Sequence, residues 1–190
     1  MTSNTVRSAT EELARLQADG CTPEQAWALF DRLPVAAVDE IVTGRWQGSE
    51  IQTGHPFDGV LGASGWYGKQ FDDAHSVHPL LFSDTDGKIF AVDPRRVPLS
   101  LTGKVPLPGV RAIRKSLRYT GIALRTQRYT ARLRAVEYRG VLSAAMVYDH
   151  LPIIDHFRRV DADTLFGVMD MRGMTEPYFF VLRTPSGLPA

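Results

Sequence analysis

The first part of the chain carries apolar residues at the spacing of an amphipathic helix. They recur every three or four positions from Val6 to Leu16. A second stripe of this kind runs through TPEQAWALFDRLP, in which Thr22 and Gln25 have the spacing of a capping box and a proline takes the first helical position. We predict N-terminal helices within residues 1–36, and we interpret them as packing elements because nothing on them points to chemistry.

From residue 37 the pattern changes to that of β-structure. Branched apolar residues alternate with polar ones over about residues 40–52, which predicts a strand. The sequence HPFDGVLGAS then predicts a short helix, which must depend on tertiary packing because its glycines make it weak alone. The turn residues from Asp84 to Gly87 predict a hairpin.

The last third of the chain consists of five short β-rich segments with turn-like links between them. Such a series is typical of an antiparallel meander. With the earlier strand and hairpin the count approaches about eight strands, enough to close a barrel around a small cavity. We therefore predict a mainly β fold, an antiparallel calycin-like β-barrel that spans residues 37–190 as a single domain. Its meander covers about residues 125–185, with segments 129–138, 140–149, 152–160, 164–172 and 178–184.

Composition limits the classes of function. The chain has 190 residues, a net charge of +1 and a single cysteine, Cys21. So small a net charge gives no global field that favours nucleic acid or a membrane surface, and no apolar run is long enough to span a bilayer. The N-terminus lacks the apolar stretch of a secretory signal, and one cysteine fits a reducing compartment. We expect a cytoplasmic protein without nucleic-acid or membrane partners, and the sequence leaves a homodimer open.

Charge is distributed unevenly along the chain. Residues 104–139 contain ten Lys or Arg and one carboxylate, Glu137. One interpretation is a surface for phosphate, carboxylate or nucleic acid. We favour the other, a solvated face that balances the acidic N-terminal part, because the basic residues alternate as in a strand instead of forming a run.

The densest chemistry lies in residues 43–71, TGRWQGSEIQTGHPFDGVLGASGWYGKQF. Its seven glycines imply sharp turns or close approach of the backbone to a neighbour, and the aromatic and basic residues beside them suggest a ligand. Lys69 and Tyr67 are candidates for binding a ligand carboxylate or phosphate; the alternative for Lys69 is a surface position beside an aromatic core. Candidate ligand contacts in this segment and beyond it are Trp46, His55, Trp66, Tyr67, Lys69, His78 and Asp170.

The motif GRWQG at residues 44–48 matches the GXWXG signature of a family of uncharacterised bacterial and fungal proteins. TGHPFDGVLGASGWYGKQF and VHPLLF also resemble that family, and VYDHLPIIDHFRRVD and GVMDMRG resemble the domain of unknown function that usually follows. The resemblance covers about residues 20–185, with the GXWXG segment at about 37–95. It implies no established activity.

A looser similarity is to the calycins (lipocalins, fatty-acid-binding proteins and nitrobindins), whose first strand also carries Gly-x-Trp. This similarity implies that Trp46 closes the end of the barrel against an arginine of the last strand, for which Arg183 is the candidate. The glycine-rich residues 55–69 would then cover one end of the cavity. The alternative for Trp46 is ligand contact. The similarity also admits a haem held by one histidine, as in nitrobindins, without indicating which one.

Histidine is the side chain that titrates near neutral pH. His55 and His78 each precede a proline, which favours extended backbone, and they either cap the following turn or present an imidazole at the cavity mouth. No pair of histidines has the HExxH spacing, and no three of them fall on one short element, so we expect no metal site; the alternative is a site assembled from several strands.

The strongest candidates for chemistry lie in VYDHLPIIDHFRRV. If its two strands pair through the turn at residues 150–152, Met146 lies opposite Asp155, on the more apolar face with Tyr148. Asp155 and Tyr148 would then face a hydrophobic interior, where burial raises the pKa of a carboxylate and suits it to general acid or base catalysis. Asp170, on the next strand, is a candidate to join them.

The alternative is a shift of register by one residue, which reverses the two faces of the strand. Asp155 would then point outward and pair with Arg158 or Arg159. His156 has the opposite parity to Asp155, so it becomes a catalytic candidate only if this shift occurs.

Two functions from different classes fit these patterns. The first is binding of a hydrophobic or amphipathic small molecule in the barrel cavity. The second is a cofactor-independent acid–base enzyme, such as an isomerase, lyase or cyclase, in which Asp155, Tyr148 and a histidine transfer protons. We favour binding, because the sequence does not by itself bring the polar groups together.

Overall fold

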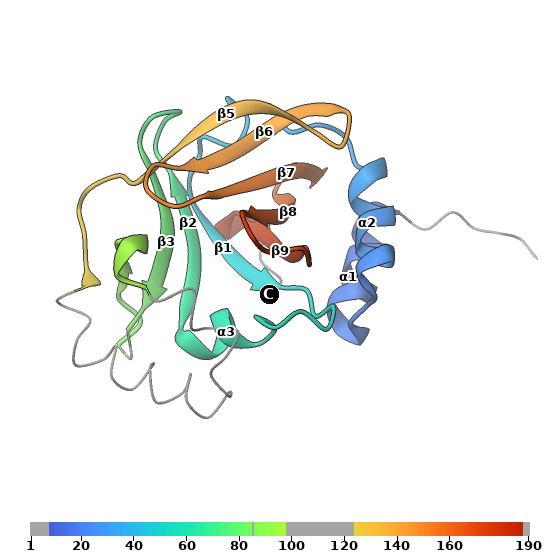
Figure 1. Cartoon of the computed structure of the whole chain (residues 1–190), viewed down its shortest axis with the longest axis horizontal. Helices are drawn as coiled ribbons and strands as arrows, with labels where there is room; N and C mark the ends of the chain where they lie inside the picture. The colour runs from blue at the N-terminus through green and yellow to red at the C-terminus, as the bar shows by residue number, and fades with distance from the viewer. Residues whose placement is uncertain (1–7, 85, 98–123, 188–190) are drawn as a thin grey trace, which may run out of the picture.

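The computed structural model of the chain describes residues 8–84, 86–97 and 124–187. Its described part contains three α-helices, two short 3₁₀ turns and nine strands that form one sheet (Figure 1). The helices are α1 (Ala9–Asp19), α2 (Pro23–Arg32) and α3 (Val60–Ser64), and the 3₁₀ turns are Pro94–Arg96 and Pro185–Gly187. The strands are β1 (Gly44–Glu50), β2 (Trp66–Phe71), β3 (Val77–Ser83), β4 (Ile89–Ala91), β5 (Ala131–Tyr138), β6 (Val141–Tyr148), β7 (Ile153–Asp161), β8 (Thr164–Met171) and β9 (Tyr178–Arg183).

The sheet curls into a ring in which all neighbouring strands are antiparallel. The strand order is β2-β1-β9-β8-β7-β6-β5-β3, and pairing of β2 with β3 closes the ring, while β4 extends it from β3. The prediction of a mainly β, antiparallel, barrel-like fold is therefore confirmed. The seam between β3 and β5 is narrow, since one residue pair, Val77–Ala131, joins them within the described residues.

The C-terminal strands form the predicted meander. Each of β5 to β8 pairs with the strand that follows it. Met146 lies opposite Asp155, as the hairpin pattern predicts, so the alternative with Asp155 turned outward is wrong. Because side chains alternate across a strand, this register sends Asp155 into the barrel and His156 to its outer face.

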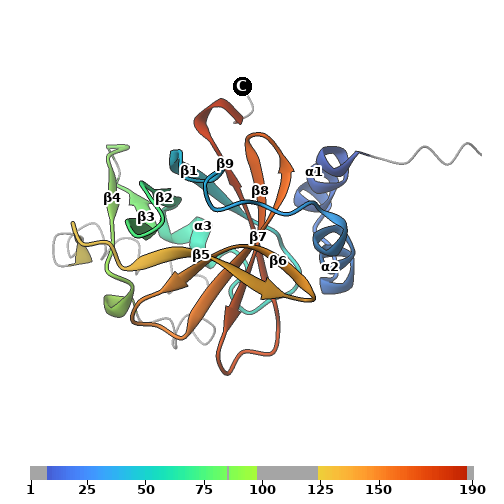
Figure 2. The ribbon, with the colours of Figure 1, turned by 90° about the horizontal axis from the view of Figure 1, so that it is seen from above.

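The N-terminal helices pack on the outside of the barrel, against the part of its wall formed by β8 and β9 (Figures 1 and 2). Thr22 and Gln25 form the predicted capping box at the start of α2. Phe30 of α2 packs on Phe166, with ring centroids 6.0 Å apart, and Trp27 packs on Phe179 at 4.9 Å. Within the described segments, no helix is long and apolar enough to cross a membrane.

The wall formed by β8 and β9 is apolar on both faces. On its outer face Phe166, Val168, Phe179 and Val181 belong to the core under the helices. Residues of the opposite parity, such as Leu165, Phe180 and Leu182, belong to the core inside the ring. The barrel therefore separates two hydrophobic cores, and the inner one contains the cavity described below.

Two expectations about the barrel ends are wrong. Of the residues 55–69 that we expected to cover one end of the cavity, residues 66–69 instead form part of wall strand β2, paired with β1 and β3. Trp46 and Arg183 do not pair. Arg183 lies opposite Gln47 and therefore shares the outer face of the sheet, where it donates a hydrogen bond to Gln17 of α1 at 2.6 Å.

Candidate functional site

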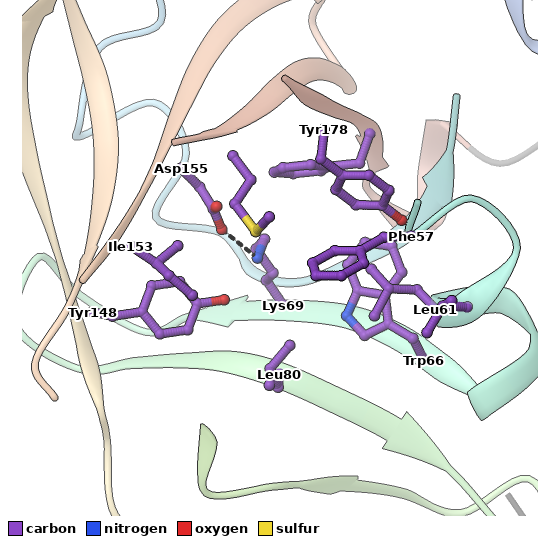
Figure 3. Close-up of a pocket in the computed structure, with 12 residues that line it drawn as sticks. Phe57, Leu61, Trp66, Lys69, Leu80, Tyr148, Ile153, Asp155 and Tyr178 are labelled. Atoms are coloured by element: carbon purple, nitrogen blue, oxygen red, sulfur yellow. Dashed lines mark hydrogen bonds and ion pairs between the residues drawn. The ribbon is translucent and has the colours of Figure 1, made fainter. Parts of the chain in front are cut away.

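A cavity of about 60 Å³, measured as the space open to the centres of water molecules, lies inside the barrel beside α3 (Figure 3). A single water needs about 10–15 Å³ by this measure, so the cavity has room for a small organic group. Its wall is mainly aromatic and aliphatic, with one ion pair among these side chains. The lining residues are Phe57, Val60, Leu61, Trp66, Lys69, Leu80, Tyr148, Ile153, Asp155, Met169, Tyr178 and Phe180.

Two carboxylates position α3 and the loop before it. Asp58 Oδ2 accepts hydrogen bonds of 2.8–3.0 Å from the three backbone N–H groups of residues 53–55. Glu50, on β1, accepts hydrogen bonds from the N–H groups of Gly59 at 2.6 Å and Gly62 at 2.7 Å. The N–H groups that open a helix have no partner within it, so Glu50 stabilises a helix too short and glycine-rich to persist alone. Burial raises the pKa of Glu50 despite these hydrogen bonds.

Strand β2 supplies two lining residues through an irregular register. Residues three apart on a regular strand point to opposite faces, yet Trp66 and Lys69 both line the cavity. The register against β3 shifts between Trp66 and Gly68, which changes the alternation of side chains. Gly68 has φ +147°, and a Cβ there would collide with the carbonyl oxygen of Trp46. The bulge at Gly68 therefore brings the lysine inside.

The second glycine of the GXWXG motif makes room for the cavity wall. A Cβ at Gly48 would overlap the six-membered ring of the Trp66 indole. The six-membered ring of the indole therefore packs directly against the β1 backbone at Gly48, in space that a side chain there would fill. The motif tryptophan, Trp46, does not line the cavity. It is fully buried in the inner core, and its Nε1–H donates to the carbonyl oxygen of Ile41 at 3.1 Å.

A buried ion pair crosses the interior from β2 to β7. Lys69 Nζ lies 2.7 Å from Asp155 Oδ2 and 3.3 Å from the carbonyl oxygen of Pro79, to both of which it donates. The two ionic side chains are only 3% and 2% exposed. The ammonium also lies 5.0 Å from the ring centroid of Phe180 and 5.8 Å from that of Trp66, within range of cation–π attraction. An ion pair so fully removed from water depends on these surrounding groups for its stability.

Burial raises the pKa of two acidic groups that line the cavity, Asp155 and Tyr148. Burial raises the pKa of Asp155, and the nearby Lys69 ammonium opposes that rise. Burial also raises the pKa of Tyr148 well above its usual value, with the Asp155 carboxylate adding to the effect. Tyr148 is therefore a neutral hydrogen-bonding group at physiological pH.

Several polar atoms point at the same apolar space. Asp155 Oδ1 and Trp66 Nε1 are both buried and have no hydrogen-bond partner among the described residues. The hydroxyl of Tyr148 points toward the space between them and Lys69 (Figure 3). Buried polar atoms normally have partners, so a donor, an acceptor and an ion pair around one void indicate a place for a polar group of a ligand.

The structure brings together four of the residues that the sequence predicts. Trp66 and Lys69 on β2, Tyr148 on β6 and Asp155 on β7 all line the cavity. The pairing of Lys69 with Asp155, 86 positions apart, changes the interpretation of the lysine. Its charge is already compensated, so it is neither a surface lysine nor a free cation for a ligand anion.

Other predicted residues lie away from the cavity. Tyr67 is half-buried and outside the lining, and Asp170 is exposed on the outer face of β8. His78 packs against Tyr129 in a tilted arrangement, with ring centroids 4.6 Å apart. His156 is buried on the outer face of β7, stacked on Tyr138 at 3.7 Å, and burial lowers its pKa to about 4.

His55 caps a turn, as one of its two interpretations predicts. Its Nδ1 accepts a hydrogen bond from the Phe57 N–H at 3.0 Å, so the ring proton of the neutral form is on Nε2. The ring packs against Phe57 and Tyr178, which line the cavity, but is not itself a lining residue. Burial lowers the pKa of His55, which favours the neutral ring.

The sequence did not single out the aromatic lining of β9. Tyr178 and Phe180 face the cavity with the spacing of two that a strand requires. That spacing was visible in YFFVLR, but the residues of opposite parity are equally apolar because the helices cover them. Periodicity therefore predicts the strand and cannot say which of its faces points inward.

The cavity is not suited to a haem held by histidine. Of the described residues, none that lines it is a histidine. Elsewhere in the described part of the chain, no group of three metal-ligating side chains comes together. We therefore derive no chemistry through haem or a metal.

Comparisons with known proteins place these observations in a family context. Residues 28–87 match the model of a family described as "GXWXG protein", and residues 129–184 match a "Domain of unknown function (DUF4334)". No curated protein matches the chain significantly. A crystal structure of a protein from Thermomonospora curvata is similar, with 33% sequence identity and a TM-score of 0.67, over 92% of this chain and 97% of that chain.

Proposed function

The chain belongs to the GXWXG family, and its GXWXG segment is followed by a domain of unknown function. From the cavity, we propose that the protein binds a small, neutral, amphipathic molecule inside the barrel. One observation carries the proposal. A mainly apolar cavity holds a compensated ion pair, Lys69–Asp155, beside polar atoms that lack partners. Ligand sites typically combine an apolar lining with a few convergent polar groups.

The ion pair limits the charge of the ligand. Since Asp155 compensates Lys69, a carboxylate or phosphate would add an uncompensated negative charge to an apolar cavity. Burying an unpaired charge is far more costly than burying a hydrogen-bonded neutral group. The polar end of the ligand is therefore neutral. This proposal takes the place of our expectation that Lys69 binds a ligand carboxylate or phosphate.

The unpaired atoms define that polar end further. Asp155 Oδ1 is free to accept a hydrogen bond, and the Trp66 Nε1–H is free to donate one. A hydroxyl satisfies both, and a carbonyl satisfies the indole N–H and the Tyr148 hydroxyl. The rest of the ligand contacts the rings of Trp66, Tyr178 and Phe180.

Binding of N-phenyl-1-naphthylamine, a neutral dye that fluoresces in apolar surroundings, tests the proposal. We expect saturable fluorescence with one dye per chain. Leu61→Trp fills the cavity from α3, and it should weaken binding at least about tenfold. The matched control is Leu142→Trp on the exposed surface of β6, where the parent leucine is 62% exposed; it should leave binding unchanged. Absence of saturable binding, or equal binding by both variants, contradicts the proposal.

The unpaired oxygen of Asp155 favours a second candidate, a cofactor-independent acid–base enzyme. Asp155 is a buried carboxylate with a raised pKa and one free oxygen facing a cavity, as a general base requires. Tyr148 is beside it, and Lys69 takes the place in which we expected a histidine. Exchange of the α-protons of cyclohexanone in D₂O, followed by NMR, tests this candidate. The wild type should accelerate exchange, and equal rates with Asp155→Asn contradict it.

A further inference from the structure

The chain uses lysine sparingly, yet places one at the centre of its cavity. It has 18 arginines and four lysines, at positions 69, 88, 104 and 115. Arginine forms the stronger ion pair with a carboxylate, through two parallel hydrogen bonds, and it remains charged. Lysine differs in that its amine, once it loses a proton, is a nucleophile. The position buried opposite Asp155 therefore holds the basic residue that is suited to covalent chemistry.

The surroundings of Lys69 are those that a reactive amine needs. Lys69 lines the cavity, and its Nζ is held at 2.7 Å from a carboxylate that can take up a proton. Burial raises the pKa of that carboxylate, which brings it closer to a value at which it accepts a proton. The rings of Trp66, Tyr148 and Phe180 surround the amine at 5.0–5.9 Å, so water has little access to it.

We propose that Lys69 forms a protonated imine with an aldehyde or ketone that occupies the cavity. This inference rests on the proposed function, and it names the class of ligand. The Lys69 ammonium first passes a proton to Asp155, and the amine nitrogen attacks the carbonyl carbon. The C–O bond then breaks, and the oxygen leaves as water with two of the three ammonium protons. The third proton stays on the iminium nitrogen, so the positive charge is conserved and no oxidant or reductant is needed.

Asp155 has two roles in this reaction. It carries the proton from the amine to the departing oxygen, which is general acid–base catalysis. Afterwards its carboxylate faces the iminium cation, as it faces the ammonium at 2.7 Å beforehand. The Trp66 N–H and the Tyr148 hydroxyl are placed to donate to the carbonyl oxygen while it gains negative charge.

Reductive trapping tests the inference on the full-length protein. The protein is incubated with benzaldehyde and sodium cyanoborohydride, which converts an imine into a stable benzylamine, and the modified residues are identified by peptide mass spectrometry. We expect Lys69 to be labelled at least about tenfold faster than the exposed Lys88, because the cavity holds the aldehyde beside the amine. Lys69→Arg should lose the fast label, and Asp155→Asn should slow it about a hundredfold.

The dye experiment separates this inference from the function on which it rests. If benzaldehyde displaces N-phenyl-1-naphthylamine but Lys69 is labelled no faster than Lys88, the imine is wrong and non-covalent binding stands. If the dye does not bind and benzaldehyde does not label Lys69, the proposed ligand binding and the proposed imine are both wrong. Labelling of the wild-type protein needs no variant, so an unfolded Lys69→Arg or Asp155→Asn protein leaves the result interpretable.

Discussion

Strand β7 buries a charged side chain on each of its faces, and the two lie in very different surroundings. Asp155 points into the barrel, and Arg158, three residues later, packs on the outer face under α2. Asp155 is 1% exposed and Arg158 is 2% exposed. By burial alone, both are equally unusual for charged residues.

What surrounds the two charges distinguishes them. Asp155 has an opposite charge at 2.7 Å, an unpaired oxygen and an empty space beside it. Arg158 also has an unpaired atom, Nε, but it does not line the cavity, and it has the ring of Phe30 at 5.1 Å and the carbonyl oxygen of Tyr138 at 3.5 Å. A buried charge therefore indicates a site when it faces a void with other free polar atoms, and indicates packing when apolar side chains fill the space around it.

The largest expected effect comes from breaking the inner pair. Lys69→Met leaves Asp155 buried without its cation, and we expect a loss of about 3–5 kcal/mol in the free energy of unfolding at pH 7. The pKa of Asp155 in the folded variant should rise further above its value in the unfolded chain. Folded protein then binds more protons than unfolded protein, so the deficit should shrink as pH falls toward 4.

Urea unfolding over this pH range measures that effect. The double variant Lys69→Met, Asp155→Leu removes both charges and should recover to within about 1 kcal/mol of the wild type. A deficit in the single variant that does not change with pH would show that Asp155 is not the group responsible.

Gly48→Ala tests the contact between the GXWXG motif and the cavity wall. The new methyl group overlaps the Trp66 indole, which must move toward the cavity. We therefore expect the free energy of unfolding to fall by about 1–3 kcal/mol, and the dye to bind more weakly. The control is Gly62→Ala in α3, where a Cβ meets nothing within 4 Å. Alanine is favoured over glycine in a helix, so this control should be neutral or stabilise by up to about 1 kcal/mol. Equal losses for both variants, by urea unfolding, would contradict the role of Gly48.

On the outer face, His156 should respond to pH without affecting the cavity. Its pKa is about 4 in the folded protein, below the ordinary value of 6.5, because burial disfavours the charged ring. Unfolded chains therefore bind more protons as pH falls through 6.5 toward 4, and folding loses stability in that window, on the order of 1–2 kcal/mol by pH 5. His156→Gln should remove this part of the pH dependence in thermal unfolding curves while dye binding at pH 7 is unchanged. A cavity role for His156 would instead appear as lost binding.

The smallest effect is expected for Arg158→Met. Methionine keeps an unbranched apolar side chain under α2 and removes a charge that is poorly compensated there, so stability should change by less than about 1 kcal/mol. Dye binding should not change. If Arg158→Met lowers the free energy of unfolding as much as Lys69→Met does, the proposed difference between the surroundings of Asp155 and Arg158 is wrong.

Local features of this protein follow from the sequence because they depend on neighbouring residues. The capping box of Thr22 and Gln25, the hydrogen bond from the Gly87 N–H to the Asp84 carbonyl oxygen and the register of Met146 against Asp155 each involve short separations along the chain. For such features the residue types themselves supply the hydrogen bonds and turn geometry. The strands of the meander belong to this class, because each of them pairs with the next strand along the chain.

Tertiary structure decided which of these residues meet. Lys69 and Asp155 are 86 positions apart, and they face each other only because the sheet closes and a bulge at Gly68 turns the lysine inward. The period of a strand predicts alternation but not a bulge, and on β9 both faces are apolar, so the inner one could not be recognised. The sequence thus determined the strands and the acid–base candidates on β6 and β7. The closed barrel determined that a lysine, and not a histidine, completes them.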